Sequence, residues 1–86
     1  INLTVSDPAA LLHDVAAHYA PAAAGRDDCD GLSLAFADWR FNLRASNTEP
    51  LVRLNVETRG DAALLVNKTH EVLMLISALQ AAKETL

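Results

Sequence analysis

Residues 44–50, RASNTEP, form a polar segment between two apolar stretches, and their side chains are of types that bind anions. The guanidinium of Arg44 can grip a phosphate or a carboxylate through two parallel N–H donors. Glu49 is the one acidic side chain of the segment, so it is the only local competitor that we expect for a bound anion. The candidate anion ligands are Arg44, Ser46, Asn47, Thr48 and Arg53.

The backbone of this segment can also contribute to an anion site. Successive N–H groups of a turn can point into one concavity, and Asn47 tolerates the positive φ that such a nest requires. Pro50 fixes its own φ and stiffens the end of the segment. A phosphate dianion suits one or two guanidinium groups combined with neutral donors. The alternative reading is an ordinary polar turn with solvated arginines.

Other reactive side chains do not form a second site, so we expect no catalytic residue and no metal ligand. His13 and His18 are five residues apart, which is the wrong spacing for one helical face, and with His70 they are expected at surface or boundary positions. Cys29 has no second cysteine to pair with and is expected to be a small, half-buried apolar residue. The acidic run at residues 27–30, DDCD, is interpreted as a solvated turn.

Length and charge limit the class of protein. The chain has 86 residues and a formal net charge of −4, which fits one domain spanning residues 1–86. A general nucleic-acid binder would be basic, so nucleic acid is not an expected partner. We find no apolar run of about 18 residues and no signal-peptide pattern, so no membrane partner is expected and a cytoplasmic location is the default. The first residue is Ile1 and not Met, so we expect a piece of a longer protein.

The apolar periodicity predicts a β-α-β(3–4)-α order of elements. Asp7 and Asp61 can cap the two helices, and Pro8 and Pro21 suit the first helical position and the end of the first helix. The expected strands cover residues 1–5, 26–29, 31–36, 39–44 and 51–57, and the expected helices cover residues 8–20 and residue 62 onward.

Alternation along the strands separates an apolar face from a polar one. The expected core residues are Leu12, Val15, Ala16, Tyr19, Leu32, Leu34, Phe36, Trp39, Phe41, Leu43, Val52, Leu54, Val56, Ala62, Leu65, Val66, Thr69, Leu73, Met74, Ile76 and Leu79. The expected polar face carries Ser33, Arg40, Asn42, Arg53, Asn55 and Glu57. The fold class is therefore α+β, a two-layer sandwich with a mostly antiparallel sheet and two helices on one face.

Two longer motifs resemble a known family. The stretch FNLRASNTEPLVRLNVE resembles the phosphate-binding signature of the C-terminal, fourth domain of the α-D-phosphohexomutase superfamily. The upstream stretch DGLSLAFADWRFNLR resembles the bacterial phosphomannomutase/phosphoglucomutase branch, and the resemblance covers nearly the whole chain. It implies a TATA-binding-protein-like fold. Asn47 stands where the phosphoglucosamine branch usually has Gly, which favours mannose or glucose phosphates.

The resemblance also implies a role within a larger enzyme. In that family a phosphoserine on the first domain exchanges phosphoryl groups with a hexose phosphate through a bisphosphorylated intermediate. The implied cofactors of the full enzyme are Mg²⁺, held by aspartates of another domain, and a hexose 1,6-bisphosphate activator. By resemblance this chain lacks those parts and is inactive alone. Its implied partners are the hexose phosphate and the other domains of the same polypeptide. Carried over residue by residue, Arg44, Ser46, Asn47 and Thr48 hold the phosphate that does not react, and Arg53 is an addition.

Another function class stays open beside this reading. A stand-alone ligand-sensing or protein-interaction module could share the same sandwich fold. A mutase domain should bind hexose phosphates and ignore plain sugars, whereas an interaction module should ignore both. A nucleic-acid binder is disfavoured further because Phe36, Trp39 and Phe41 lie on the apolar strand face, where they cannot stack on bases.

Overall fold

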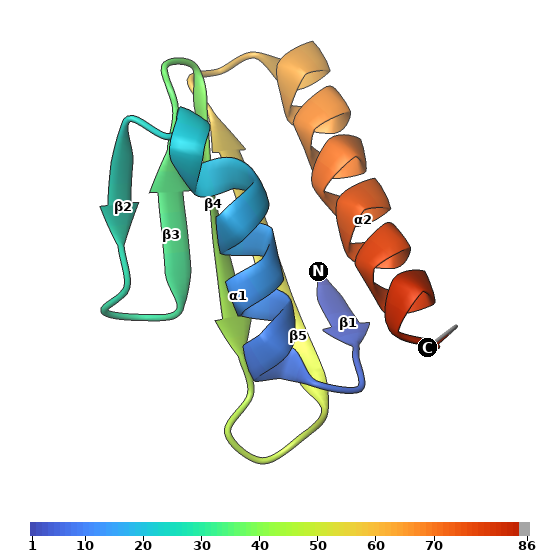
Figure 1. Cartoon of the computed structure of the whole chain (residues 1–86). Helices are drawn as coiled ribbons and strands as arrows, with labels where there is room; N and C mark the ends of the chain where they lie inside the picture. The colour runs from blue at the N-terminus through green and yellow to red at the C-terminus, as the bar shows by residue number, and fades with distance from the viewer. Residues whose placement is uncertain (85–86) are drawn as a thin grey trace.

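The structure is a computed structural model that describes residues 1–84, and it is a sheet covered on one face by two helices (Figure 1). The elements in chain order are β1 Asn2–Thr4, α1 Pro8–Tyr19, a 3₁₀ turn Ala20–Ala22, β2 Gly25–Asp27, β3 Leu32–Ala35, β4 Trp39–Ala45, β5 Leu51–Thr58 and α2 Ala62–Glu84. The predicted order of elements and the α+β two-layer class are confirmed.

The sheet has five strands in the order β1-β5-β4-β3-β2, and every neighbouring pair is antiparallel. Strand β1 pairs with β5 and not with its neighbour in sequence, so β1 forms one edge of the sheet and β2 forms the other. The predicted strand faces are confirmed, because Leu43 lies opposite Leu54 on the helix side and Asn42 lies opposite Asn55 on the open side.

Helix α1 begins where the sequence predicts. The side chain of Asp7 accepts a hydrogen bond from the Ala10 N–H at 3.2 Å, and Pro8 occupies the first turn, where its missing N–H costs nothing. The helix buries Leu11 against the sheet, whereas the predicted Leu12 is only half-buried. The packed face of α1 is therefore rotated slightly from the predicted one.

An aromatic cluster joins α1 to the sheet. The Tyr19 ring contacts the rings of Phe36, Trp39 and Phe41 edge-on, at centroid distances of 5.9, 5.8 and 5.3 Å. The Tyr19 hydroxyl donates to Glu71 on α2 at 2.7 Å, so one side chain connects all three elements. These contacts place the aromatic side chains in the core, as the strand parity predicts.

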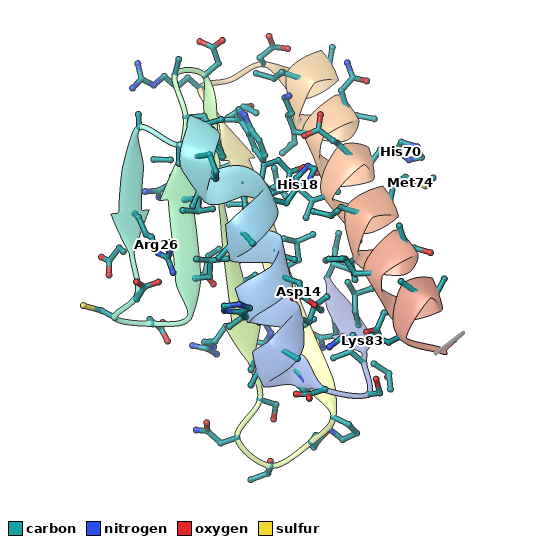
Figure 2. All side chains as sticks on the ribbon, in the orientation of Figure 1. Asp14, His18, Arg26, His70, Met74 and Lys83 are labelled. Atoms are coloured by element: carbon teal, nitrogen blue, oxygen red, sulfur yellow. The ribbon has the colours of Figure 1, made fainter. Side chains whose placement is uncertain are left out.

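Helix α2 is capped by Asp61, whose side chain accepts from the Leu64 N–H at 2.9 Å. Its fully buried contacts with the sheet come from Val72 and Ile76. The prediction that Met74 and Val66 belong to the core is wrong, because these side chains are 57% and 68% exposed. Leu65 is also exposed, at 36%, and so is Ala62, so the core prediction is wrong for these two residues as well. Figure 2 shows Met74 and His70 on the outer side of α2, away from the sheet.

Near its C-terminal end, α2 also approaches α1. Lys83 on α2 and Asp14 on α1 come within 3.7 Å, and both are labelled in Figure 2. An 18-residue window within Ala62–Lys83 has a mean hydropathy of 1.3, so by length and composition this helix could cross a membrane. The expectation that no uninterrupted apolar run reaches about 18 residues is confirmed, because the polar residues 67–71, NKTHE, interrupt this helix. One such helix is weak evidence, so this segment alone does not indicate a membrane.

Candidate anion-binding site

The loop between β4 and β5 forms one wall of an open groove of about 800 Å³ at the end of the sheet. This end of the sheet lies at the bottom of Figure 1, where β4 turns into β5. All five residues predicted as anion ligands line the groove: Arg44, Ser46, Asn47, Thr48 and Arg53. Strand β1 adds Asn2, and the β2–β3 loop adds Cys29, Asp30 and Gly31.

The loop is held by hydrogen bonds to the Ser46 hydroxyl. Its Oγ accepts from the backbone N–H groups of Thr48 and Glu49, at 3.3 and 3.2 Å. These two N–H groups therefore point into the turn, and within residues 1–84 no residue other than Gly has a positive φ. The predicted nest of backbone donors with Asn47 at positive φ is wrong. The Ser46 O–H proton still has a free direction in which to donate.

Two arginines of the site lie opposite each other on neighbouring strands. Arg44 of β4 is the register partner of Arg53 of β5, on the open face of the sheet beside the loop. Like charges directly opposite each other in an antiparallel pair destabilise the sheet. The guanidinium groups turn apart, and Arg53 Nε donates to Asn2 Oδ1 on β1 at 3.1 Å. An anion between the two arginines would relieve this repulsion.

Arg44 turns the other way and meets a carboxylate. Its Nη1 lies 3.4 and 3.3 Å from the two carboxylate oxygens of Asp30 on the β2–β3 loop. The expectation that Glu49 is the only acidic competitor is therefore wrong, and so is the interpretation of Asp30 as merely solvated. The pair is open to solvent, since the Arg44 and Asp30 side chains are 48% and 76% exposed. Such pairs stabilise a fold by about 0–1 kcal/mol.

Sequence reasoning missed Asp30 and Asn2 as parts of this site. Asp30 is followed by Gly31, and an aspartate before a glycine between two strands indicates a tight loop. This signal could have placed Asp30 at an end of the sheet, where the side chains of neighbouring strand ends lie. Asn2 is separated from Arg53 by 51 positions, so no local pattern reports their contact. Both contacts depend on which strands pair.

The remaining reactive side chains have ordinary surroundings. Cys29 is exposed, which corrects the half-buried prediction, and the neighbouring carboxylate of Asp27 raises the pKa of its thiol. The Cys29 backbone N–H donates to Asp27 at 2.8 Å and lowers the pKa of that carboxyl. His13, His18 and His70 are exposed. Within residues 1–84, no three His, Cys, Asp or Glu side chains are grouped to hold a metal ion.

Comparison with known proteins identifies the family of the chain. The family described as "Phosphoglucomutase/phosphomannomutase, C-terminal domain" matches residues 1–73. A phosphomannomutase of Salmonella montevideo is 55% identical over 78 residues, which are 91% of this chain and 17% of that protein. A protein of Xanthomonas campestris pv. campestris, named "Phosphohexose mutases", is 55% identical over 76 residues, 88% of this chain and 17% of its own length.

A phosphomannomutase of Escherichia coli K12 is 48% identical over 77 residues, 90% of this chain. The chain spans 17% of the length of each of these curated relatives. The family match covers β1 to β5 and the first half of α2, including the whole β4–β5 loop. The chain belongs to the family of phosphoglucomutase/phosphomannomutase C-terminal domains.

Proposed function

We propose that this chain is the phosphate-binding domain of a four-domain phosphohexomutase that interconverts mannose 6-phosphate and mannose 1-phosphate. The residues that hold the phosphate in this proposal are Arg44, Ser46, Asn47, Thr48 and Arg53. The observation that carries it is the opposed pair Arg44 and Arg53 beside a loop of neutral donors, lining one groove. Membership of the family and the relatives' names support the parent activity.

The role of this chain in the reaction is to bind one phosphate of the substrate and so to orient the sugar. Phosphoryl transfer depends largely on positioning and on charge stabilisation. A grip on the phosphate that does not react places the far end of the sugar at a nucleophile held elsewhere in the polypeptide. Since the sugar must bind in two orientations, the groove should recognise phosphate and not the sugar hydroxyls. Closure of the domain over the substrate would complete the site.

The chemical step is assigned to other domains. The described residues offer no grouping that fits Mg²⁺, and we derive no step through that ion. When bound in the parent enzyme, Mg²⁺ would neutralise charge on the transferring phosphoryl group. The proposal therefore makes the isolated chain inactive, and any mutase turnover by it would contradict the assignment.

The ion pair with Asp30 does not prevent phosphate binding. An exposed pair contributes about 0–1 kcal/mol, whereas a hydrogen bond to a charged group contributes about 1.5–3 kcal/mol. A dianion that reaches Arg44, Arg53 and the Ser46 hydroxyl together can form several such bonds. Phosphate is thus expected to outcompete Asp30 for the guanidinium or to share it.

The test is an NMR titration of the 86-residue chain with mannose 1-phosphate and with inorganic phosphate. We expect both ligands to shift the amides of residues 44–49, and we expect plain mannose to leave them unchanged. Arg44→Ala should raise Kd about 10- to 100-fold, because it removes one charge-assisted contact of about 1.5–3 kcal/mol. In the parent enzyme the same change should lower kcat/KM by a similar factor.

Arg40→Ala is the matched control. Arg40 lies on the same face of β4 but pairs with Glu57 at 2.7 Å, and it does not line the groove. Its removal should leave Kd within about twofold, because a solvent-exposed ion pair contributes little. An equal loss of affinity in the two variants would mean that phosphate follows overall charge and has no defined site at the loop.

A stand-alone interaction module is the second candidate. The observation in its favour is the exposed apolar outer side of α2, with Val66 and Met74. That function predicts no amide shifts with either phosphate ligand. The titration described above therefore decides between the two functions.

A further inference from the structure

The β2–β3 loop, residues 28–31, lies directly against the backbone of Arg44. Gly31 has φ +78°, and a Cβ built on it would lie 2.7 Å from the Leu43 carbonyl oxygen and 2.9 Å from the Arg44 Cα. A side chain at this position would therefore collide with β4. The close approach brings the carboxylate of Asp30 to the guanidinium of the next strand.

Hydrogen bonds fix the loop in this position. The side chain of Asn42 on β4 donates to the Asp30 carbonyl oxygen at 2.8 Å and to Ser33 Oγ at 2.9 Å. The Cys29 N–H donates to the Asp27 carboxylate at 2.8 Å. The Asp30 backbone is thus tied to the same strand that carries Arg44, so its carboxylate is a fixed partner and not a chance neighbour.

The ion pair with Asp30 leaves the Nε–Nη2 edge of the Arg44 guanidinium available to a ligand. Both Asp30 oxygens face Nη1, and within residues 1–84 neither Nε nor Nη2 of Arg44 donates a hydrogen bond. A phosphate binds two N–H groups of one guanidinium edge most strongly. Asp30 and a phosphate could therefore contact Arg44 at the same time, from different sides.

We propose that Asp30 is a positioning residue that orients Arg44 for phosphate. This inference rests on the proposed function. A free arginine side chain has many rotamers, and affinity falls when binding must select one of them. A carboxylate on a fixed loop restricts those rotamers before phosphate arrives. Asp30 thus acts through Arg44, without touching the ligand.

The charge of Asp30 has an opposing effect, because a carboxylate near the groove repels a dianion. The two effects can be separated by substitution. Asp30→Asn keeps an oxygen that can accept from Nη1 and removes the charge, whereas Asp30→Ala removes both. If positioning dominates, Asp30→Asn binds phosphate at least as tightly as the wild type, and Asp30→Ala binds it more weakly.

The experiment titrates inorganic phosphate into the 86-residue chain and its variants at constant ionic strength, and it follows the amides of residues 44–48. We expect Kd to rise about two- to fivefold for Asp30→Ala, the size of effect that an exposed ion pair can produce. The matched control is Asp28→Ala, which removes the same charge from the same loop but breaks a pair with Arg26. It should not weaken phosphate binding.

A second measurement reports on the order of the Arg44 side chain and does not depend on the affinity for phosphate. The heteronuclear NOE of the Arg44 Nε–Hε group should be high in the phosphate-free wild type and in Asp30→Asn, and low in Asp30→Ala. A disordered Arg44 side chain in the phosphate-free wild type would overturn the inference whether or not the alanine variant folds. A merely structural role of Asp30 would leave this NOE unchanged while amide signals moved throughout the sheet.

The outcomes separate this inference from the proposed function. If the wild type binds phosphate at the loop and Asp30→Ala binds it equally or more tightly, Asp30 does not position Arg44 for phosphate. The positioning inference is then wrong, and the proposed function stands. Equal weakening by Asp28→Ala would overturn the role as well. If the wild type shows no phosphate-induced shifts at residues 44–48, the proposed function and this inference fail together.

Discussion

Replacing a glycine with alanine at two positions of similar, positive φ tests how closely the β2–β3 loop packs on β4. Gly31 and Gly60 have φ values of +78° and +77°. An added Cβ at Gly60 meets no atom within 4 Å, whereas at Gly31 it meets the Leu43 carbonyl oxygen at 2.7 Å. Gly60→Ala is therefore the control for backbone strain, and Gly31→Ala adds the collision.

The expected magnitudes follow from these contacts. A left-handed conformation costs an L residue roughly 1–2 kcal/mol, and reduced freedom of the unfolded chain offsets about 0.4–1 kcal/mol of it. Gly60→Ala should thus lower the free energy of unfolding by about 1 kcal/mol. Gly31→Ala should cost about 1–3 kcal/mol more, because backbone must move to remove the overlap.

Urea denaturation followed by tryptophan fluorescence measures both variants. Trp39 is the one tryptophan of the chain and is buried in the aromatic cluster, so its emission reports on loss of the core. A domain of this size has a free energy of unfolding of about 4–13 kcal/mol, so a difference of 1–3 kcal/mol is well resolved. Equal destabilisation of the two variants within about 0.5 kcal/mol would refute the close packing of the loop on Arg44.

Three further outcomes concern the sheet and the helices. Tyr19→Phe removes the hydroxyl that donates to Glu71, and we expect the free energy of unfolding near neutral pH to fall by about 1–2 kcal/mol. That hydrogen bond lowers the pKa of Glu71, so its contribution is present above the unfolded pKa and is lost as pH falls through the folded pKa. Urea midpoints of the wild type and Tyr19→Phe should therefore converge in acid, and a constant gap would contradict this linkage. Glu57→Gln breaks the exposed ion pair with Arg40 and should change the free energy of unfolding by less than about 1 kcal/mol. A larger loss would show that this ion pair stabilises the fold more than an ordinary surface pair does.

Strands β3, β4 and β5 were predictable because their alternation is simple and each has one buried face. Leu34, Phe41 and Leu54 all lie on the predicted side of the sheet and are almost fully buried. Helix α2 was harder, because it is apolar on nearly all sides and its periodicity does not say which side packs. Val72 and Ile76 turn inward, whereas Val66 points to solvent. Only the pairing of the helix with the sheet selects among such faces.

The candidate site was predicted in part. The motif from Arg44 to Thr48 is local, so its donors could be read from neighbouring positions, and all of them line one groove. The orientation of the arginines could not be read in the same way. Arg44 meets Asp30 only because the β2–β3 loop folds against β4, and Arg53 meets Asn2 only because β1 pairs with β5. Such contacts depend on sheet order, which the local pattern does not contain.

The pairing of β1 with β5 has a kinetic consequence. Hairpins such as β3–β4 and β4–β5 close short loops, but docking β1 against Arg53 closes a loop of about fifty residues, which is slower. The edge of the sheet should therefore be completed late in folding, and with it the wall of the groove that Asn2 supplies. In a refolding experiment, the capacity to take up phosphate should appear after the tryptophan signal has recovered.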